Sequence, residues 1–250
     1  MTGRPRSRRP AGRRATAQSR TARRGAPAAS IDRLLDRQPW DALIQHLLKA
    51  GARVEPTTEL LRRYSRMLIE WNRSVSNLIS HNDEARIVER HIAESVEPAS
   101  WLKSSSATRW LDFGSGAGLP AIPLVIAGVG PRWSLIEARR MKTLFLRKAI
   151  ESLGIRDVEV VVSRLENLGD GTERLGAYSG FTSRAVLALG PTLALAARFI
   201  APGGAAFLWK GSQRENEMTA DPSWQDAWEF DGLLGIGQGQ ATVARFSRRG

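Results

Sequence analysis

The chain of 250 residues contains no cysteine, which excludes disulfides, cysteine-ligated zinc and thiol nucleophiles. It has only three histidines, and no set of ligands at metal-binding spacing surrounds them, so we expect no metal site. It also lacks an apolar run close to the roughly 20 residues that cross a membrane, and it lacks a signal-peptide core. We therefore expect a cytoplasmic protein without a membrane partner.

Acidic residues are absent from residues 1–24, which contain nine arginines. Without this segment the net charge of +12 falls to +3, so most of the excess positive charge belongs to one end of the chain. Residues 1–30 are mainly Arg, Ala, Gly, Ser and Pro, and this composition predicts a disordered basic tail. Three interpretations stay open: an arm that binds RNA phosphates, a dispensable leader or misassigned start, and an organelle transit peptide.

Apolar residues recur at helical spacing through residues 31–105, and this pattern predicts an N-terminal helical layer. The two clearest apolar stripes are Trp40, Leu43, Ile44, Leu47 and Leu48, and then Leu60, Leu61, Tyr64, Met67, Leu68 and Trp71. The second helix is expected to start at Thr57 or Thr58. A third helix is expected over residues 84–102.

Residues 106–250 show a different pattern, in which short apolar strands alternate with helical stretches. The expected strands are 110–113, 133–137, 158–162, 180–185 and 205–210, and the expected helices are 120–128, 140–153 and 190–200. Two closing strands are expected within residues 224–247, and Pro202-Gly203-Gly204 is expected to form a turn. The alternation predicts an α/β fold with a doubly wound parallel sheet and a ligand crevice at the carboxyl ends of its strands.

The segment RWLDFGSGAGLP, residues 109–120, places glycines at alternate positions directly after an apolar strand. Glycines at such a turn let the backbone approach a nucleotide-like ligand closely. Asp112, Gly114, Gly116 and Gly118 fit the acidic-x-G-x-G-x-G loop of methyl-donor sites without adjustment. The dinucleotide pattern fits only in a frame that runs from Gly116 to Ala121. A tight turn without a ligand is the third reading.

Glu137 ends the next expected strand, 19 residues after Gly118. In a doubly wound sheet the second strand lies beside the first, so this carboxylate is expected to face the ribose hydroxyls of a bound nucleotide. An exposed charge at the end of a strand is the alternative reading. Glu137 supports a methyl donor and a dinucleotide equally.

Six segments together give the chain a family resemblance: WNRSVSNL (71–78), RHIAES (90–95), DFGSGAGLPAIPL (112–124), SRLE (163–166), TSRA (182–185) and LWKG (208–211). In order and spacing they resemble the RsmG/GidB family of bacterial 16S ribosomal RNA methyltransferases over residues 40–250. The resemblance implies a class I, Rossmann-like methyltransferase sheet that uses S-adenosyl-L-methionine and methylates N7 of one guanine in 16S rRNA. The chain departs from the family pattern at Ile79, Glu94, Ala121 and Met141.

The resemblance also assigns cofactor-binding residues. It implies that Gly114 and Leu119 line the cofactor and that Leu165 and Glu166 flank its adenine. Arg184 is expected at the cofactor end of the fourth strand, because an arginine there is awkward in a parallel sheet unless it reaches the crevice. Gly116 completes the expected set together with Glu137.

Four residues are substrate-binding candidates. Asn72 and Asn77 follow the second helix, where amides can read base edges or close a turn. His91 has helical spacing to Glu94, and the two are expected to form a hydrogen-bonded or substrate-positioning pair. Lys210 ends the fifth strand and is a candidate for a phosphate or base contact.

The implied reaction needs little acid–base machinery, because N7 of guanine carries a lone pair and loses no proton. We therefore name no catalytic residue and expect catalysis to depend on alignment. The expected partner is 16S rRNA or the small ribosomal subunit, and a monomer suffices. The alternatives are a methyltransferase for another RNA or a small molecule, an NAD-dependent oxidoreductase, and an RNA-binding module with a degenerate donor site.

Overall fold

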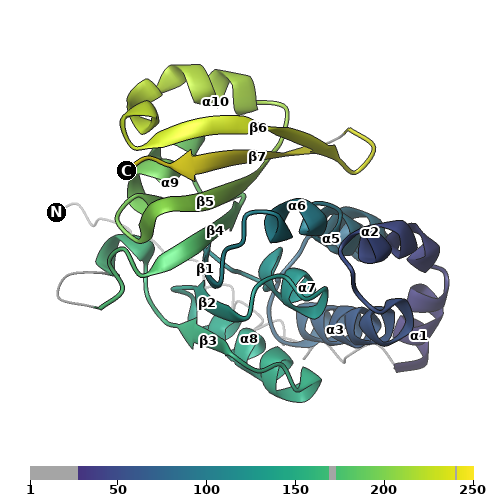
Figure 1. Cartoon of the computed structure of the whole chain (residues 1–250). Coiled ribbons are helices and arrows are strands. Elements are labelled where there is room, and N and C mark those ends of the chain that lie inside the picture. Colours follow the sequence, from purple (N-terminus) through teal and green to yellow (C-terminus); the bar gives the residue numbers. More distant parts are fainter. Residues whose placement is uncertain (1–27, 169–172, 240) are drawn as a thin grey trace, which may run out of the picture.

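The computed structural model describes residues 28–168, 173–239 and 241–250. The predicted disordered tail lies almost wholly outside these residues. Seven strands form one sheet in the order β3-β2-β1-β4-β5-β7-β6, which Figure 1 shows from the lower edge to the upper edge. The strands are β1 Arg109–Phe113, β2 Arg132–Ile136, β3 Val158–Val161, β4 Tyr178–Arg184, β5 Ile200–Lys210, β6 Trp228–Ile236 and β7 Ala241–Arg248.

Strands β1 to β5 are parallel to one another, and β7 pairs antiparallel with both β5 and β6. The expected doubly wound α/β sheet is confirmed. The helices in chain order are α1 Ala28–Asp36, α2 Ile44–Lys49, α3 Val54–Ser74, α4 His81–Glu84, α5 Glu94–Val96, α6 Ala99–Lys103, α7 Ala121–Ile126, α8 Arg140–Leu153, α9 Leu189–Ala196 and α10 Arg214–Ala220. Among the described residues no helix is both long enough and apolar enough to span a bilayer.

Successive strand residues face opposite sides of the sheet and join two hydrophobic clusters. Trp110 and Phe207 belong to the cluster shared with the helices of residues 31–103 and with α7 and α8, whereas Leu111 and Leu208 belong to the cluster on the α9 side. The N-terminal helices therefore share a core with the sheet (Figure 1). The division into a region 31–105 and a domain 106–250 stays a prediction.

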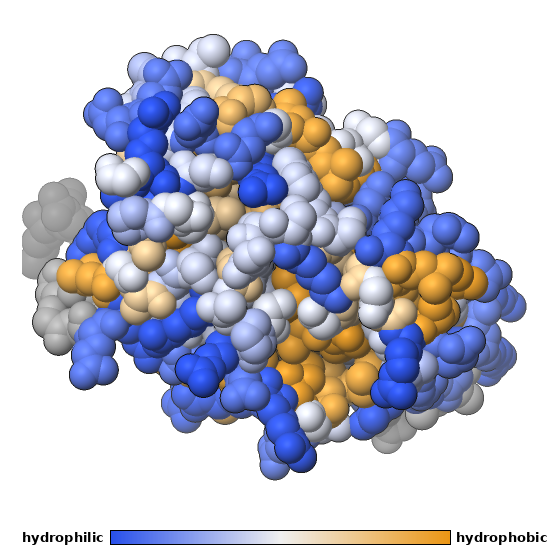
Figure 2. All heavy atoms as spheres, viewed as in Figure 1, coloured by the Kyte–Doolittle hydropathy of each residue, from blue (hydrophilic) through white to orange (hydrophobic). Residues whose placement is uncertain are grey.

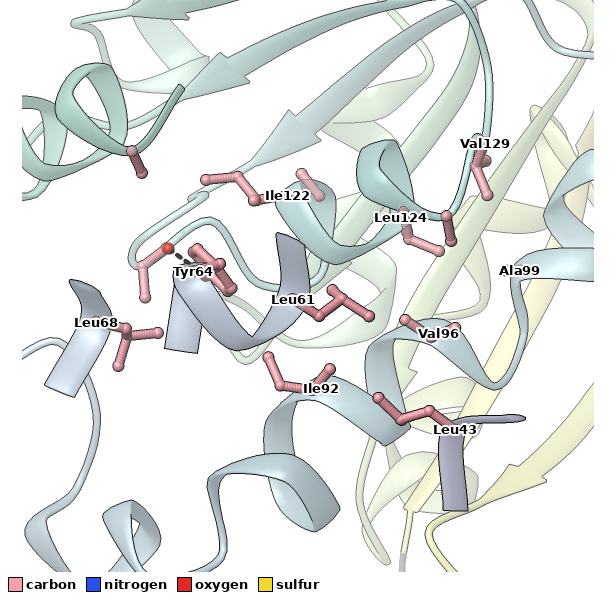
Figure 3. Packing of buried hydrophobic residues seen from close by; sticks show 14 of the residues in the cluster. Leu43, Leu61, Tyr64, Leu68, Ile92, Val96, Ala99, Ile122, Leu124 and Val129 are labelled. Atoms are coloured by element: carbon pink, nitrogen blue, oxygen red, sulfur yellow. Dashed lines mark hydrogen bonds between the residues drawn. The ribbon is translucent and has the colours of Figure 1, made fainter. Parts of the chain in front are cut away.

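Helix α3 connects the helical layer to the sheet. Leu61, Tyr64 and Leu68 are buried and point toward α7 and the segment that carries Ile92 (Figure 3). The Tyr64 hydroxyl donates to the carbonyl of Ala117, at 2.6 Å, so the helix is bonded directly to the glycine-rich loop. On the face shown in Figure 2, hydrophilic side chains predominate and apolar areas lie over the helical layer.

Several predicted boundaries are wrong for identifiable reasons. Helix α3 starts at Val54 rather than at Thr57 or Thr58, because Pro56 falls in the first turn, where its missing N–H needs no partner. The helix expected over 84–102 is divided into α4, a π-helix at Val88–Ala93, α5 and α6, and Pro98 precedes α6.

The end of the predicted sheet domain also differs. Strand β5 starts at Ile200, and the expected turn at Pro202-Gly203-Gly204 is a bulge inside it, since pairing moves from Tyr178 with Ile200 to Gly180 with Ala205. Helix α9 accordingly ends at Ala196, before the expected residue 200. Helices α1 and α10 were not predicted.

Gly180 lies where the sheet admits no side chain. Trp110 stacks on Trp133 with ring centroids 5.1 Å apart, and a Cβ at residue 180 would lie 2.4 Å from the Trp110 ring. We predict that Gly180→Ala lowers the free energy of unfolding by about 1–3 kcal/mol through overpacking. Urea unfolding measures this change.

Gly235→Ala is the matched control, since Gly235 also lies in a strand and a Cβ there meets nothing within 4 Å. It should change the free energy of unfolding by less than about 0.5 kcal/mol. Equal losses in the two variants would refute the steric explanation.

Candidate functional site

The glycine-rich loop follows β1 and crosses the carboxyl end of β2. Gly114, Gly116 and Gly118 have φ angles of +68°, +55° and +88°, a backbone region that residues other than glycine rarely adopt. The amide of Ser115 donates to the carbonyl of Ile136 at 3.0 Å, which holds the loop against the neighbouring strand. The loop thus presents backbone at the edge where the sheet is open to ligands.

Glu137 fixes the same loop from β2. One carboxylate oxygen accepts from the amide of Gly116 at 3.0 Å, and the other accepts from the amide of Arg139 at 2.7 Å. The residue is 7% exposed. A carboxylate has about four acceptor positions, so two remain for a ligand.

A cavity of about 480 Å³ lies at the carboxyl ends of the strands, a volume that suits a small-molecule or cofactor site. Its lining residues are Phe113, Gly114, Ile136, Glu137, Ala138, Arg139, Lys142, Ser163, Arg164, Glu166, Ala185, Val186 and Leu187. They follow β1, β2, β3 and β4, and the order of strands reverses between β1 and β4. This is the topological switch point at which doubly wound sheets bind ligands.

The structure brings three of the predicted cofactor residues to this cavity: Gly114, Glu137 and Glu166. Gly116 adjoins it through its bond to Glu137. Leu165 and Leu119 do not line it, because Leu165 is fully buried in the core on the α9 side and Leu119 packs against the other cluster.

Arg184 ends β4 beside the cavity, but its side chain turns toward the helical layer. Its Nη2 donates to Glu94 Oε2 at 2.6 Å and to the carbonyl of Arg90 at 2.9 Å. Arg90 Nη1 lies 2.8 Å from the other oxygen of Glu94. Burial raises the pKa of Glu94, and the two arginines act against that rise.

The sequence predicted a pair of His91 with Glu94, whereas in the structure Glu94 pairs with Arg184 and Arg90. Among the described residues the ring nitrogens of His91 have no hydrogen-bond partner, and Nε2 lies 3.7 Å from Asp83 Oδ2. Burial and then the positive charge of Arg184 lower the pKa of His91 to about 4. The imidazole is therefore neutral at neutral pH, and it does not line the cavity.

The amide of Asn72 is used inside the protein. Its nitrogen donates to Glu84 at 2.7 Å, and its oxygen accepts from the amides of Leu78 and Ile79 at 2.6 and 3.0 Å. This geometry favours the loop-closing reading of Asn72. Asn77 lies exposed in the loop that Asn72 closes.

Lys210, at the end of β5, also has internal partners. Its Nζ donates to the carbonyl of Leu187 and to Glu217 Oε2, both at 2.7 Å. Its side chain is 9% exposed.

Asp112 was recognised as the acidic position of the loop but was not predicted to be a site residue. Its Oδ1 accepts from the Thr182 hydroxyl at 2.6 Å, and its Oδ2 is buried without a hydrogen-bond partner. Burial raises the pKa of Asp112 to about 6. Within the described ranges no cluster of His, Asp and Glu could hold a metal ion.

Comparison with known proteins adds a family match. The model of the GidB family, described as rRNA small subunit methyltransferase G, matches residues 57–231. A ribosomal RNA small subunit methyltransferase G from Paracoccus denitrificans is 34% identical over 178 residues, which are 71% of this chain and 87% of the relative. Another from Sorangium cellulosum is 38% identical over 149 residues, 59% of this chain and 62% of the relative.

Two solved structures share the fold at 12% identity and a TM-score of 0.50. The PH0226 protein from Pyrococcus horikoshii matches over 69% of this chain and 94% of its own. A branched-chain polyamine synthase from Thermus thermophilus matches over 62% of this chain and 56% of its own.

The buried histidine predicts a pH dependence of stability. A folded pKa of about 4 for His91, below the ordinary 6.5, means that the unfolded chain binds the proton more readily. The contribution of His91 is present above pH 6.5 and is lost as the pH falls toward 4, by roughly 3 kcal/mol in all. The groups that face it are Arg184, Asp83 and Arg90.

We expect His91→Leu to remove this contribution, so that wild type gains stability over the variant as the pH rises from 4.5 to 7. Urea unfolding at fixed pH values measures the free energy of unfolding of wild type and variant. Asp112, whose raised pKa gives the opposite pH dependence, is present in both proteins, so its contribution cancels in the difference. His46→Leu, in α2 and outside this cluster, is the control. A difference that stays constant with pH would disprove the assignment.

Proposed function

Because this chain belongs to the family of rRNA small subunit methyltransferase G, we propose that it transfers the methyl group of S-adenosyl-L-methionine to N7 of one guanine in 16S rRNA. The family resemblance read from the sequence is thereby confirmed. Two findings in the same part of the chain support the proposal. The family match spans residues 57–231, and the switch-point cavity within that range is built on the glycine-rich loop and Glu137.

In this proposal the adenosine part of the donor lies between Glu137 and Glu166. The two free acceptor positions of Glu137 suit the ribose hydroxyls. The amino-acid part lies against the backbone of Gly114, which lines the cavity. Leu119, Leu165 and Arg184 contribute from behind the cavity wall, by supporting the loops that line it.

The RNA would be held by the cations of the cavity rim. Arg139, Lys142 and Arg164 line the cavity, and none of them forms an ion pair within the described part of the chain. Unpaired cations beside an open site suit the phosphates of an RNA strand, which provide most of the affinity but carry no sequence information. Asn77 on its exposed loop remains a candidate for a further contact.

The chemistry asks for alignment rather than for proton transfer. N7 attacks the sulfonium methyl with its lone pair, the carbon–sulfur bond breaks, and the positive charge of the donor passes to the guanine. S-adenosyl-L-homocysteine leaves as a neutral thioether. Holding the two reactants in line is the main contribution of the protein, so no general base is required. We propose a monomer that acts in the cytoplasm on 16S rRNA or on the small subunit.

The loop glycine provides a test of the donor site. A Cβ at residue 114 would lie 2.6 Å from Val186 Cγ2, on a backbone with φ +68°. We predict that Gly114→Ala raises the Kd for S-adenosyl-L-homocysteine at least about tenfold in calorimetric titration, a change of about 1.4 kcal/mol.

Gly176→Ala is the control, because Gly176 has φ +62° and a Cβ there meets no described atom within 4 Å. It carries similar backbone strain without the steric conflict, and its Kd should match wild type. Equal weakening in the two variants would contradict the proposed donor site. Binding of NAD in place of the homocysteine product would favour the oxidoreductase alternative.

The substrate is tested by transfer of labelled methyl to 16S rRNA or 30S particles from cells that lack the gene. We predict one N7-methylguanine, located by mass mapping of nuclease fragments, and no transfer to rRNA that already carries the modification. Label in another base, or none in either substrate, would overturn the assignment.

A further inference from the structure

The segment Ala185–Ala188 joins β4 to α9 and forms one wall of the cavity. Ala185 has a φ of +55°, in the left-handed region that non-glycine residues seldom adopt. Val186 and Leu187 line the cavity, yet their side chains are 37% and 40% exposed. Large apolar side chains at the mouth of a polar cavity suggest a surface that something covers during the reaction.

This wall is held from behind by an ion pair. Lys210 Nζ donates to the carbonyl of Leu187 and to Glu217 Oε2, both at 2.7 Å. The same Glu217 oxygen accepts from the amide of Leu189 at 2.9 Å, at the start of α9. The Lys210–Glu217 brace thus fixes both ends of a short segment, residues 187–189.

The opposite side of the wall is fixed by the glycine-rich loop. Val186 packs so closely on Gly114 that a Cβ at residue 114 would collide with it. The segment is therefore held between the glycine-rich loop on one side and the Lys210–Glu217 brace on the other. A displacement of the brace would move Val186 relative to the donor.

The walls after β2 and β3 are assigned to the donor in the proposed function, so the wall after β4 is available for the methyl acceptor. Glu137 follows β2, and Ser163, Arg164 and Glu166 follow β3, so the adenosine half of the proposed donor site lies on that side. Val186 and Leu187 follow β4 and face the same cavity. Apolar side chains there can lie against the flat face of an unstacked base, as single-stranded RNA sites require.

We propose that Lys210 and Glu217 are positioning residues, which clamp the carbonyl of Leu187 so that Val186 and Leu187 form a fixed platform for the target base. The inference rests on the proposed function and identifies how the acceptor is placed. It gives Lys210 a role different from the phosphate or base contact that the sequence suggested. With two of its three donors bound internally and its side chain 9% exposed, Lys210 is poorly placed to reach a phosphate.

The test compares binding with the rate of methyl transfer. Lys210→Met removes the brace, and we expect the single-turnover rate on 30S particles to fall about 10- to 100-fold, since small misplacements of a reactant cost this much. The Kd for S-adenosyl-L-homocysteine and the KM for the particle should change less than about threefold. Lys210→Arg keeps donors for both acceptors and should restore part of the rate.

Helix α10 offers a matched pair of variants. Glu217→Gln weakens the brace and should lower the rate about 3- to 10-fold. Glu215→Gln makes the same change two residues earlier, at a side chain that is 80% exposed and paired with Arg214, and it should leave the rate unchanged. If Lys210→Met fails to fold, as thermal unfolding would reveal, this pair carries the test.

A phosphate contact would give a different result. Lys142→Met, at an unpaired cation of the rim, should raise the KM and lower the salt dependence of binding by about one counterion, with the single-turnover rate preserved. The same pattern in Lys210→Met would overturn the inference, as would a wild-type rate in both brace variants. Failure of wild type to methylate 16S rRNA would instead overturn the proposed function, and the inference with it.

Discussion

The cavity depends on the carboxylate of Glu137, which accepts hydrogen bonds from two backbone amides. It joins the loop after β1 to the start of the segment that leads into α8, across two adjacent strands. Ordering this loop is costly, because its three glycines sit in left-handed backbone and lose much conformational freedom on folding. The two hydrogen bonds to this buried carboxylate help to offset the conformational entropy that the glycines lose. The same carboxylate also lines the cavity, so the group that fixes the loop is the one that we propose to receive the ribose.

A second buried carboxylate, Glu94, ties the helical layer to the sheet. Arg184 of β4 and Arg90 both pair with it, and the indole of Trp209 in β5 donates to its carbonyl at 2.8 Å. Such a pair need not stabilise the fold more than apolar packing would, because desolvation opposes the Coulombic attraction. Its effect is geometric: it fixes the end of β4, from which the wall of the cavity starts. Burial, and then the positive charge of Arg184, lower the pKa of His91, so the imidazole adds no positive charge to this cluster at neutral pH.

The sequence predicted well whatever depends on local spacing. Helix α8 has the predicted bounds, and Gly114 and Glu137 lie together at the cavity as their separation implied. Some misses are local, such as the start of α3 before Pro56, and others depend on contacts between distant residues. The partner of Arg184 lies 90 residues away in sequence, and the brace of Lys210 involves a helix without buried residues, so no hydrophobic period reveals it. Asn72 was left open between a base contact and the closing of a turn, and Lys210 was a candidate for a phosphate or base contact, because the sequence does not show whether a polar side chain faces inward or outward.

The pattern of inward-facing polar groups follows from the chemistry of the proposed reaction. When the acceptor already carries its lone pair and the donor its leaving group, no side chain has to move a proton. The accuracy with which the two reactants are placed then matters most, and it depends partly on residues behind the cavity wall. Glu94 behind the end of β4 and Lys210 behind Leu187 hold a neighbouring charge or backbone in place, whereas Glu137 lines the cavity and holds the glycine-rich loop. An enzyme of this kind is therefore expected to have its most sensitive charged residues one layer away from the reacting atoms.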